Sequence, residues 1–109
     1  MSTNLRGAKL YGANFQNSDL RGANFQHFDL QGVNFQQANF QDTNLKNAKF
    51  GCIKFTGKNK QCTNLSNVKS LTPEQVKAAK NWQQACYDSE FRKKLGLPPE
   101  NQKECIEPI

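Results

Sequence analysis

A Leu or Phe occupies every fifth position of this chain from residue 5 to residue 55. A small or apolar residue precedes each of them by two positions, and the residue between the two is Asn, Asp or Lys. An α-helix cannot keep this period on one face, because five residues rotate it by about 500°. A continuous strand cannot keep it either, since an odd spacing places alternate residues on opposite faces. The period therefore predicts short extended segments joined by corners.

Corners and stacking complete the predicted fold. In each segment the small residue and the Leu or Phe share one face, while the polar residue points away. Gly and Asn, which tolerate turn geometry, recur in the two remaining positions, for example at Gly12, Asn17 and Gly22. Five-residue sides joined by corners form a coil, and stacked coils bury a continuous core. The chain is therefore expected to be a mainly β solenoid.

The repeating unit resembles that of a known family. The segments ANFQN (13–17) and ANFQH (23–27) resemble the pentapeptide repeat, and the likeness extends from residue 3 to about residue 68. This resemblance implies a right-handed quadrilateral β-helix with four pentapeptides in each coil. The repeats suffice for roughly three coils. The solenoid is expected to occupy residues 1–71, and a short α-helical cap and tail are expected at residues 72–109.

Four pentapeptides in each coil would place residues 20 apart above one another. The inward columns predicted in this way read Phe15, Phe35, Phe55 and Leu5, Phe25, Leu45, Leu65. Burying each of these side chains stabilises the fold by about 1.5–3 kcal/mol, so the columns are expected to hold the stack together. Phe28 lies where other coils carry Ala, and it is expected to fill a gap or to push a corner outwards. Stacked Asn side chains form ladders, and one is expected at Asn4, Asn24, Asn44 and Asn64.

The pattern breaks after Phe55. Continuing the register would bury Lys58 and Lys60 in the core, and burying two unpaired ammonium groups is prohibitive. Residues 56–61 are therefore expected to leave the coil as an exposed loop. The motif then returns in weaker form at Leu65 and Val68.

The net charge of +6 is concentrated in the repeat region. Residues 1–71 carry nine Lys or Arg against three Asp, whereas the charges of residues 72–109 cancel. One end of the rod is therefore expected to carry a basic patch of Lys46, Lys49, Lys54, Lys58, Lys60 and Lys69. Such a patch fits an acidic protein, lipid head groups or nucleic acid. The alternative is a solvated face that keeps the rod soluble.

From residue 71 the sequence predicts helices. Thr72 is placed as an N-cap, Pro73 as the first helical residue and Gln75 as the partner in a capping box. Apolar residues then recur near helical spacing at Val76, Ala79, Trp82 and Cys86. A second helix is expected from residue 88 or 89 to residue 95, with position 96 as a left-handed C-cap. These helices, Trp82 included, are expected to cover the open edge and apolar core of the last coil.

Four cysteines lie at positions 52, 62, 86 and 105. Their even number and local spacing favour disulfides, and the preferred pairing is Cys52–Cys62 with Cys86–Cys105. In unbroken register Cys52 and Cys62 would lie at diagonally opposite corners, so this pairing requires a rerouted coil; otherwise one of them pairs with Cys86. Disulfides indicate an oxidising compartment, whereas four reduced thiols would indicate the cytoplasm. No Cys-x-x-Cys pair suggests a zinc site.

No catalytic constellation is recognisable in the sequence. It has no Gly-rich phosphate loop, and its one histidine, His27, is predicted at an outward corner. We therefore expect a non-enzymatic structural or protein-interaction module with no cofactor, metal or small-molecule substrate, and with an unidentified protein partner. A gyrase-binding DNA mimic, known among pentapeptide-repeat proteins, is disfavoured because such mimics are acidic. Nucleic-acid binding is disfavoured because exposed aromatics for stacking are scarce beyond Tyr11 and Tyr87.

Compartment and assembly are expected from other features. The LTPEQ start (71–75) and the FRKKLG ending (91–96) of the helical region resemble lumenal pentapeptide-repeat proteins of plastids and cyanobacteria. This resemblance implies the thylakoid lumen or the periplasm, after removal of a targeting segment; the alternative is the cytoplasm. No run of about 18 apolar residues predicts a membrane span. No cap is visible at the N-terminal end, which is expected to fray, to pair with a second copy in a dimer, or to reflect a truncated chain.

Overall fold

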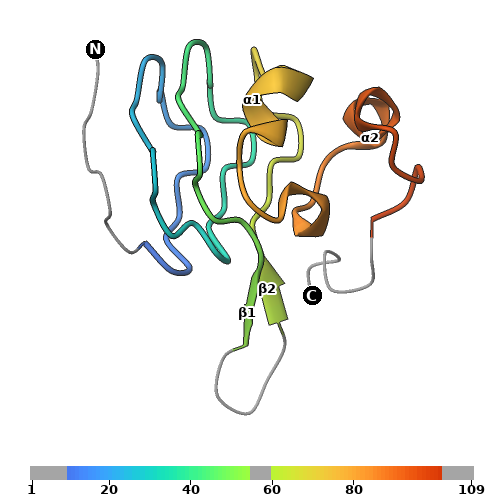
Figure 1. Cartoon of the computed structure of the whole chain (residues 1–109), viewed down its shortest axis with the longest axis horizontal. Helices are drawn as coiled ribbons and strands as arrows, with labels where there is room; N and C mark the ends of the chain where they lie inside the picture. The colour runs from blue at the N-terminus through green and yellow to red at the C-terminus, as the bar shows by residue number, and fades with distance from the viewer. Residues whose placement is uncertain (1–9, 55–59, 102–109) are drawn as a thin grey trace.

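The structure, a computed structural model, describes residues 10–54 and 60–101. Its strands are β1 (Cys52–Lys54) and β2 (Lys60–Cys62), and its helices are α1 (Pro73–Lys77), the 3₁₀ helix η1 (Trp82–Gln84) and α2 (Ser89–Leu95). Most of the other described residues form stacked coils that hold no continuous strand, seen towards the left of Figure 1.

Parallel backbone bridges join the coils at one residue in each pentapeptide. They link Asn14 to Asn34, Asp19 to Asn39, Asn24 to Asn44 and Asp29 to Lys49. Each bridged pair is 20 residues apart, so one turn of the coil takes four pentapeptides and the bridges form four columns. Because each side contributes a single bridged residue, the sides are too short to be continuous strands.

The polar residue of each pentapeptide helps to turn the corner that follows it. Oδ1 of Asn24 accepts a 3.0 Å hydrogen bond from the backbone N–H of Gln26, and Asn34 accepts the same bond from Gln36 at 2.9 Å. The next residue is left-handed, as at His27 with a φ of 63°. Gly and Asn adopt this conformation most readily, which explains their frequency at the corners.

Stacked aromatic rings fill the core. The ring centroids of Phe15 and Phe35 lie 5.7 Å apart with their planes 12° from parallel, one above the other as their column predicts. Phe25 and Leu45 are buried in the second predicted column. Phe28 is fully buried and packs edge-on against Phe25 at 5.0 Å, so it fills a gap in the core.

The predicted columns are wrong above the second coil. After residue 51 the chain leaves the stack as the β1–β2 hairpin, and the next bridge joins Asn34 to Asn64, 30 residues apart. Asn64 therefore lies above Asn34 and not above Asn44. Leu65 likewise continues the Phe35 column instead of the Leu45 column.

The place expected for Phe55 is therefore taken by Leu65. Phe55 itself, like Leu5, lies outside the described residues. The departure expected at residues 56–61 begins earlier, at Cys52, because β1 and β2 pair with each other and not with the coils. The lysines correctly indicated a break in the repeat, but they did not indicate where it starts.

Helix α1 begins with the capping box that the sequence predicts. The Thr72 hydroxyl accepts a 3.1 Å hydrogen bond from the Gln75 N–H, and Oε1 of Gln75 accepts one of 2.8 Å from the Thr72 N–H. Pro73 is the first helical residue. The helix ends at Lys77, so the apolar residues from 76 to 86 do not share one helix as their spacing predicts.

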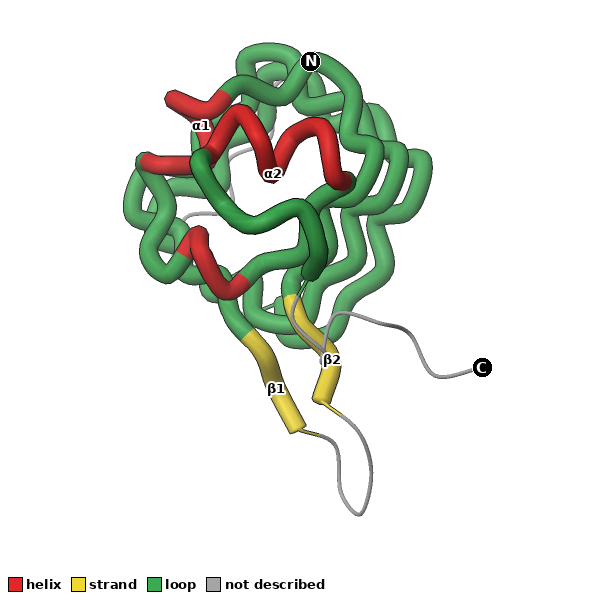
Figure 2. The backbone as a smooth tube through the Cα atoms, turned by 90° about the vertical axis from the view of Figure 1, so that its right-hand side faces the viewer, coloured by secondary structure: helices red, strands yellow, loops and turns green. Residues whose placement is uncertain are grey.

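The chain beyond α1 continues the parallel ladder. Lys80 bridges Lys49 and Cys86 bridges Asn64, so the ladder runs past residue 71. The Lys80 N–H donates to the Ala48 carbonyl at 2.7 Å, which occupies a backbone group at the edge of the last coil. An unpaired strand edge is costly and prone to aggregate, so this pairing overrides the helical spacing. In Figure 2 the helices lie across the near end of the stack.

Helix α2 has the ends that the sequence predicts. The Asp88 carboxylate accepts a 3.2 Å hydrogen bond from the Phe91 N–H as the N-cap, and Gly96 has a φ of 77° as the C-cap. Phe91 and Leu95 are buried, and Trp82 of η1 lies half-buried against the core.

Tyr87 corrects a sequence expectation, because it is fully buried and not an exposed aromatic. Its hydroxyl donates a 2.6 Å hydrogen bond to the Trp82 carbonyl. Burial raises the pKa of Tyr87 far above its usual value, and the Arg92 charge opposes this only in part. Tyr11 is the exposed aromatic among the described residues, with 51% of its surface accessible.

We expect the fold to weaken in alkaline solution because of Tyr87. Its folded pKa exceeds the unfolded value of about 10, so its stabilising contribution is complete below about pH 10 and is lost as the pH rises further. Tyr87→Phe should remove this dependence while costing about 1 kcal/mol at neutral pH through the lost hydrogen bond. Thermal denaturation of both proteins between about pH 8 and pH 11 checks this, with exposed Tyr11→Phe as the control. An equal alkaline decline in the Tyr87→Phe protein would contradict it.

Candidate interaction site

The β1–β2 hairpin projects from the stack in both Figure 1 and Figure 2. Its antiparallel partners are Cys52–Cys62, Ile53–Gln61 and Lys54–Lys60. A disulfide bond joins Cys52 to Cys62 where the hairpin meets the stack. Because an isolated two-stranded hairpin is marginally stable at best, this cross-link and the contacts with the coils must hold it in place.

The hairpin is an insertion that leaves the register of the stack unchanged. Bridged residues are 20 apart before it and 30 apart across it, so it adds ten residues to one turn. Without residues 53–62 the sequence would read AKFGCTNLSNVK, which is an unbroken five-residue repeat. The stack therefore does not need these ten residues.

Gly51 and Thr63 close the coil where the hairpin leaves it. The Gly51 N–H donates to Oγ1 of Thr63 at 3.1 Å, and the Thr63 N–H donates to the Gly51 carbonyl at 2.9 Å. The Thr63 hydroxyl also lies 2.7 Å from the Leu30 carbonyl, to which it donates. Thr63 is fully buried, so both ends of the insertion are fixed independently of the disulfide.

Gly32 forms a socket for one face of the hairpin. A Cβ at this position would lie 2.6 Å from Cγ1 of Ile53, so Gly leaves the room that Ile53 occupies. The Gly32 carbonyl accepts a 2.6 Å hydrogen bond from Nε2 of Gln61, which is opposite Ile53 in the hairpin. On the other face, Sγ of Cys52 lies 4.0 Å from the Gln84 carbonyl in η1. We call the first contact the Gly32 socket.

The predicted basic residues do not form one patch. Lys49 and Lys69 lie in different bridge columns, and the column of Asn24 and Asn44 lies between them along the coil. Lys46 is exposed at the corner that follows Asn44. The prediction fails because it treated these lysines as neighbours along the chain, whereas successive pentapeptides face different directions.

Two of the predicted basic residues do lie together. Lys54 and Lys60 are directly opposite each other on the hairpin, and both are exposed. Lys58 lies outside the described residues.

The Cys52–Cys62 bond is one of the two predicted disulfides. The hairpin allows it, because the two cysteines lie on neighbouring strands and not at the diagonal corners of an unbroken coil. Cys86 is buried and disulfide-bonded, while its predicted partner, Cys105, lies outside the described residues. No cysteine within residues 10–54 and 60–101 is a free thiol.

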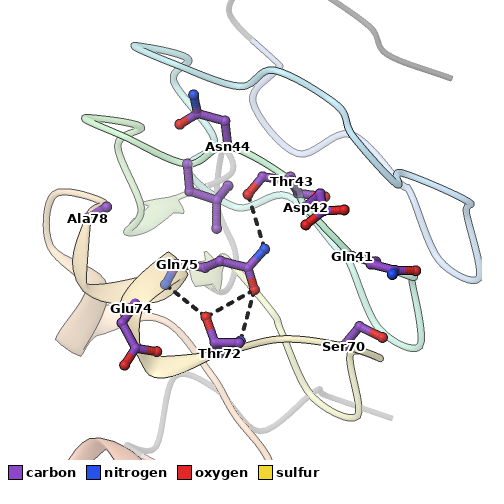
Figure 3. A pocket seen from close by; sticks show the side chains of 10 residues that line it. Gln41, Asp42, Thr43, Asn44, Ser70, Thr72, Glu74, Gln75 and Ala78 are labelled. Carbon is purple, nitrogen blue, oxygen red and sulfur yellow. Dashed lines mark hydrogen bonds between the residues drawn. The ribbon is translucent and has the colours of Figure 1, made fainter.

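A hollow of about 560 Å³ lies between α1 and the corner at residues 41–45 (Figure 3). Gln75 crosses it, donating from Nε2 to the carbonyls of Phe40 at 2.8 Å and Thr43 at 3.1 Å. Its Oε1 accepts from Thr72, so the whole amide is engaged within the protein. The carboxylates of Asp42 and Glu74 are exposed along the lining. This hollow is a seam that joins the cap to the coil.

The titratable groups are largely at the surface. Among the described residues no group of three or more His, Cys, Asp or Glu could hold a metal ion. His27 is exposed at a corner. Nη2 of Arg21 lies 2.7 Å from Oδ2 of Asp19, and this hydrogen bond lowers the pKa of that carboxyl to about 2. The pair is exposed, so it is a surface ion pair.

Sequence reasoning missed Arg92, which is only 5% exposed. Its Nη1 donates to Oδ1 of Asn101 at 3.0 Å, and its Nε donates to the Pro98 carbonyl. Asn101 in turn donates to the Tyr87 carbonyl at 2.9 Å. Arg92 therefore anchors the chain that follows α2. A basic residue in the last turn of a helix is ordinary, so the sequence carries no signal of its burial.

Five-residue sides, bridged every 20 residues along the stack, define a β-solenoid repeat protein. The family model described as Pentapeptide repeats matches residues 1–37 and 18–57 with eight copies, which is more than half of the chain. The chain therefore belongs to the pentapeptide-repeat family, whose members are generally non-enzymatic structural modules. A search of curated proteins finds no match. None of the helices in the described ranges is long and apolar enough to cross a membrane.

Proposed function

We propose that this chain is a non-enzymatic protein-interaction module that works in an oxidising compartment. The observation that carries the proposal is the inserted hairpin. Residues 53–62 contribute nothing to the register of the stack, yet the disulfide, the Gly32 socket and buried Thr63 hold them in one orientation. A rigid element that the fold does not require is suited to contact another molecule, because binding sites work best on preorganised supports.

The finer architecture is part of this proposal. Four bridge columns in each turn support the right-handed quadrilateral β-helix that the family resemblance implies. Under this proposal the helical segments act as the cap of the lumenal members. A crystal structure tests it, and a left-handed or three-sided coil would contradict it.

For the compartment we propose the thylakoid lumen or the periplasm. The support is chemical, because disulfides persist in oxidising compartments and are reduced in most cytosols. Three of the four cysteines lie in the described ranges, and all three are disulfide-bonded. Whether the module is a monomer or a dimer through its N-terminal end stays a prediction, since residues 1–9 lie outside the described residues.

We expect no free thiols in the protein isolated from its native cells. The protein is unfolded without reductant and titrated with a thiol reagent, then titrated again after reduction, when all four cysteines should react. Alkylation during cell lysis controls for oxidation in the extract. Four reactive thiols before reduction would contradict both the disulfides and the proposed compartment.

The interaction itself is tested by capture and reconstitution. Tagged oxidised protein is used to capture binding proteins from the native extract, and each candidate is then purified separately. A partner should re-form a saturable complex of fixed stoichiometry with the pure protein. If no captured protein re-forms such a complex, the proposed function is wrong.

A further inference from the structure

We propose that the β1–β2 hairpin is the partner-binding arm and that Lys54 and Lys60 hold an acidic protein surface. This inference rests on the proposed interaction function, and it names the binding surface and the chemistry of the partner. It depends on four properties of the hairpin: its faces, its unneutralised charge, its rigidity and its lack of apolar or aromatic contacts for other ligands.

Alternation along the strands divides the hairpin into two faces. Ile53 and Gln61 form the face that contacts the Gly32 socket. Lys54 and Lys60 belong to the opposite face, two residues further along each strand than the disulfide. Both side chains are exposed, so the two ammonium groups are presented away from the coils.

No described carboxylate neutralises these lysines. Residues 43–73 contain no Asp or Glu, and the salt bridge within residues 10–54 and 60–101 is the distant pair of Arg21 and Asp19. Like charges directly opposite each other on two strands repel and destabilise the pair. A pair of carboxylates on a partner would convert this repulsion into attraction. The placement of Lys54 against Lys60 therefore favours an acidic partner.

The hairpin holds the two lysines in a fixed place. The Cys52–Cys62 disulfide fixes the strand register, and the buried contacts of Gly51 with Thr63 fix both ends. An arm that is already ordered loses less conformational entropy on binding. The same two lysines on a free loop would bind more weakly for this reason.

The surroundings favour an acidic protein over a membrane or a nucleic acid. Stable membrane binding requires an apolar anchor or a cluster of several basic residues. In the described ranges the exposed large hydrophobic side chain is Tyr11, which lies in the first coil and not on the hairpin. Nucleic acids require a continuous basic track or aromatic stacking. Lys49 and Lys69 point away along separate columns, so the hairpin is not part of such a track.

The test is an NMR titration of the oxidised, ¹⁵N-labelled full chain with a decaglutamate peptide at low and high salt. The largest shifts are expected for the backbone amides of residues 52–54 and 60–62, and salt should weaken them. The double variant Lys54→Gln/Lys60→Gln should bind at least about fivefold more weakly. The matched control Lys46→Gln/Lys69→Gln also removes two exposed charges, and it should change the affinity by less than about twofold.

Other outcomes overturn the proposal. Absent binding at low salt, shifts spread evenly over the exposed lysines, or equal losses in the two double variants would each do so. Tighter binding through the hairpin to phosphatidylglycerol vesicles or to a short DNA duplex would identify a membrane or a nucleic acid as the ligand instead.

The natural complex separates this inference from the proposed function. A reconstituted partner complex that survives Lys54→Gln/Lys60→Gln would remove the hairpin assignment and leave the interaction function intact. A second variant lacks residues 53–62 and carries Cys52→Ser, and it should retain the fold and lose the partner. If this deletion variant does not fold, the two lysine substitutions still decide the question.

Discussion

Phe35→Asp is expected to leave the chain unfolded. Phe35 is fully buried, stacks on Phe15 at 5.7 Å and meets Phe40 edge-on at 5.0 Å. Removing a buried Phe side chain costs about 3–5 kcal/mol, and a carboxylate in its place would be buried without a partner at a further cost of several kcal/mol. Domains of this size are stable by only about 5–15 kcal/mol, so the substitution should remove most or all of that stability.

Circular dichroism and thermal denaturation measure this effect. Phe35→Leu keeps an apolar side chain in the column and should cost about 1–2 kcal/mol. Gln16→Asp introduces the same charge at an exposed position of the first coil and should change stability by less than about 0.5 kcal/mol. A soluble Phe35→Asp protein with a cooperative transition would show that Phe35 does not lie in the core.

Gly32→Val is expected to destabilise the protein by about 2–5 kcal/mol, for two separate reasons. The φ of Gly32 is 70°, and a left-handed conformation costs a residue with a Cβ about 1–2 kcal/mol. The new Cβ would also lie 2.6 Å from Cγ1 of Ile53, and overpacking of this kind costs about 1–3 kcal/mol. The hairpin should be pushed out of the Gly32 socket.

Two controls separate the reasons. Gly22 has a φ of 71° at the equivalent corner one turn away, so Gly22→Val reports the backbone cost without the hairpin. In the variant without residues 53–62, Gly32→Val should likewise lose the steric cost and retain the backbone cost. Free energies of unfolding from chemical denaturation give both comparisons. An equal cost of Gly32→Val with and without the hairpin would mean that the socket does not exist.

The stack could be predicted from the sequence because its signal is local and strictly periodic. The inward position of Phe15, Phe25 and Phe35 follows from the two-residue alternation within each side, which does not depend on the rest of the chain. The ends of the helices were predictable for the same reason. The capping box of Thr72 and Gln75 and the left-handed Gly96 each require only a few neighbouring residues.

The register above the second coil could not be predicted, because it depends on contacts between distant residues. Leu65 follows Phe35 because Gly51 and Thr63 meet and close the coil, and no spacing in the sequence states that they meet. The segment from Val76 to Cys86 was misassigned for a related reason. Its backbone completes the edge of the last coil, and that edge exists only in the folded stack.

The candidate site was visible only in part. The cysteines at 52 and 62 and the lysines that could not be buried marked the insertion. Gly32 gave no distinct signal, because it occupies the same corner position as Gly12 and Gly22. The division of the lysines among separate columns also required the structure, since net charge carries no information about direction.

The closure at Gly51 and Thr63 has a consequence for the size of the insertion. The two ends of the side loop meet at one point, so the coils above and below encounter the same geometry whatever lies between those ends. Lengthening a flexible loop is cheap, at about 0.6 kcal/mol for each doubling of its length. The rod is therefore a display scaffold with one attachment port, where a longer loop or a small folded domain with adjacent termini could replace the hairpin while the core stays unchanged.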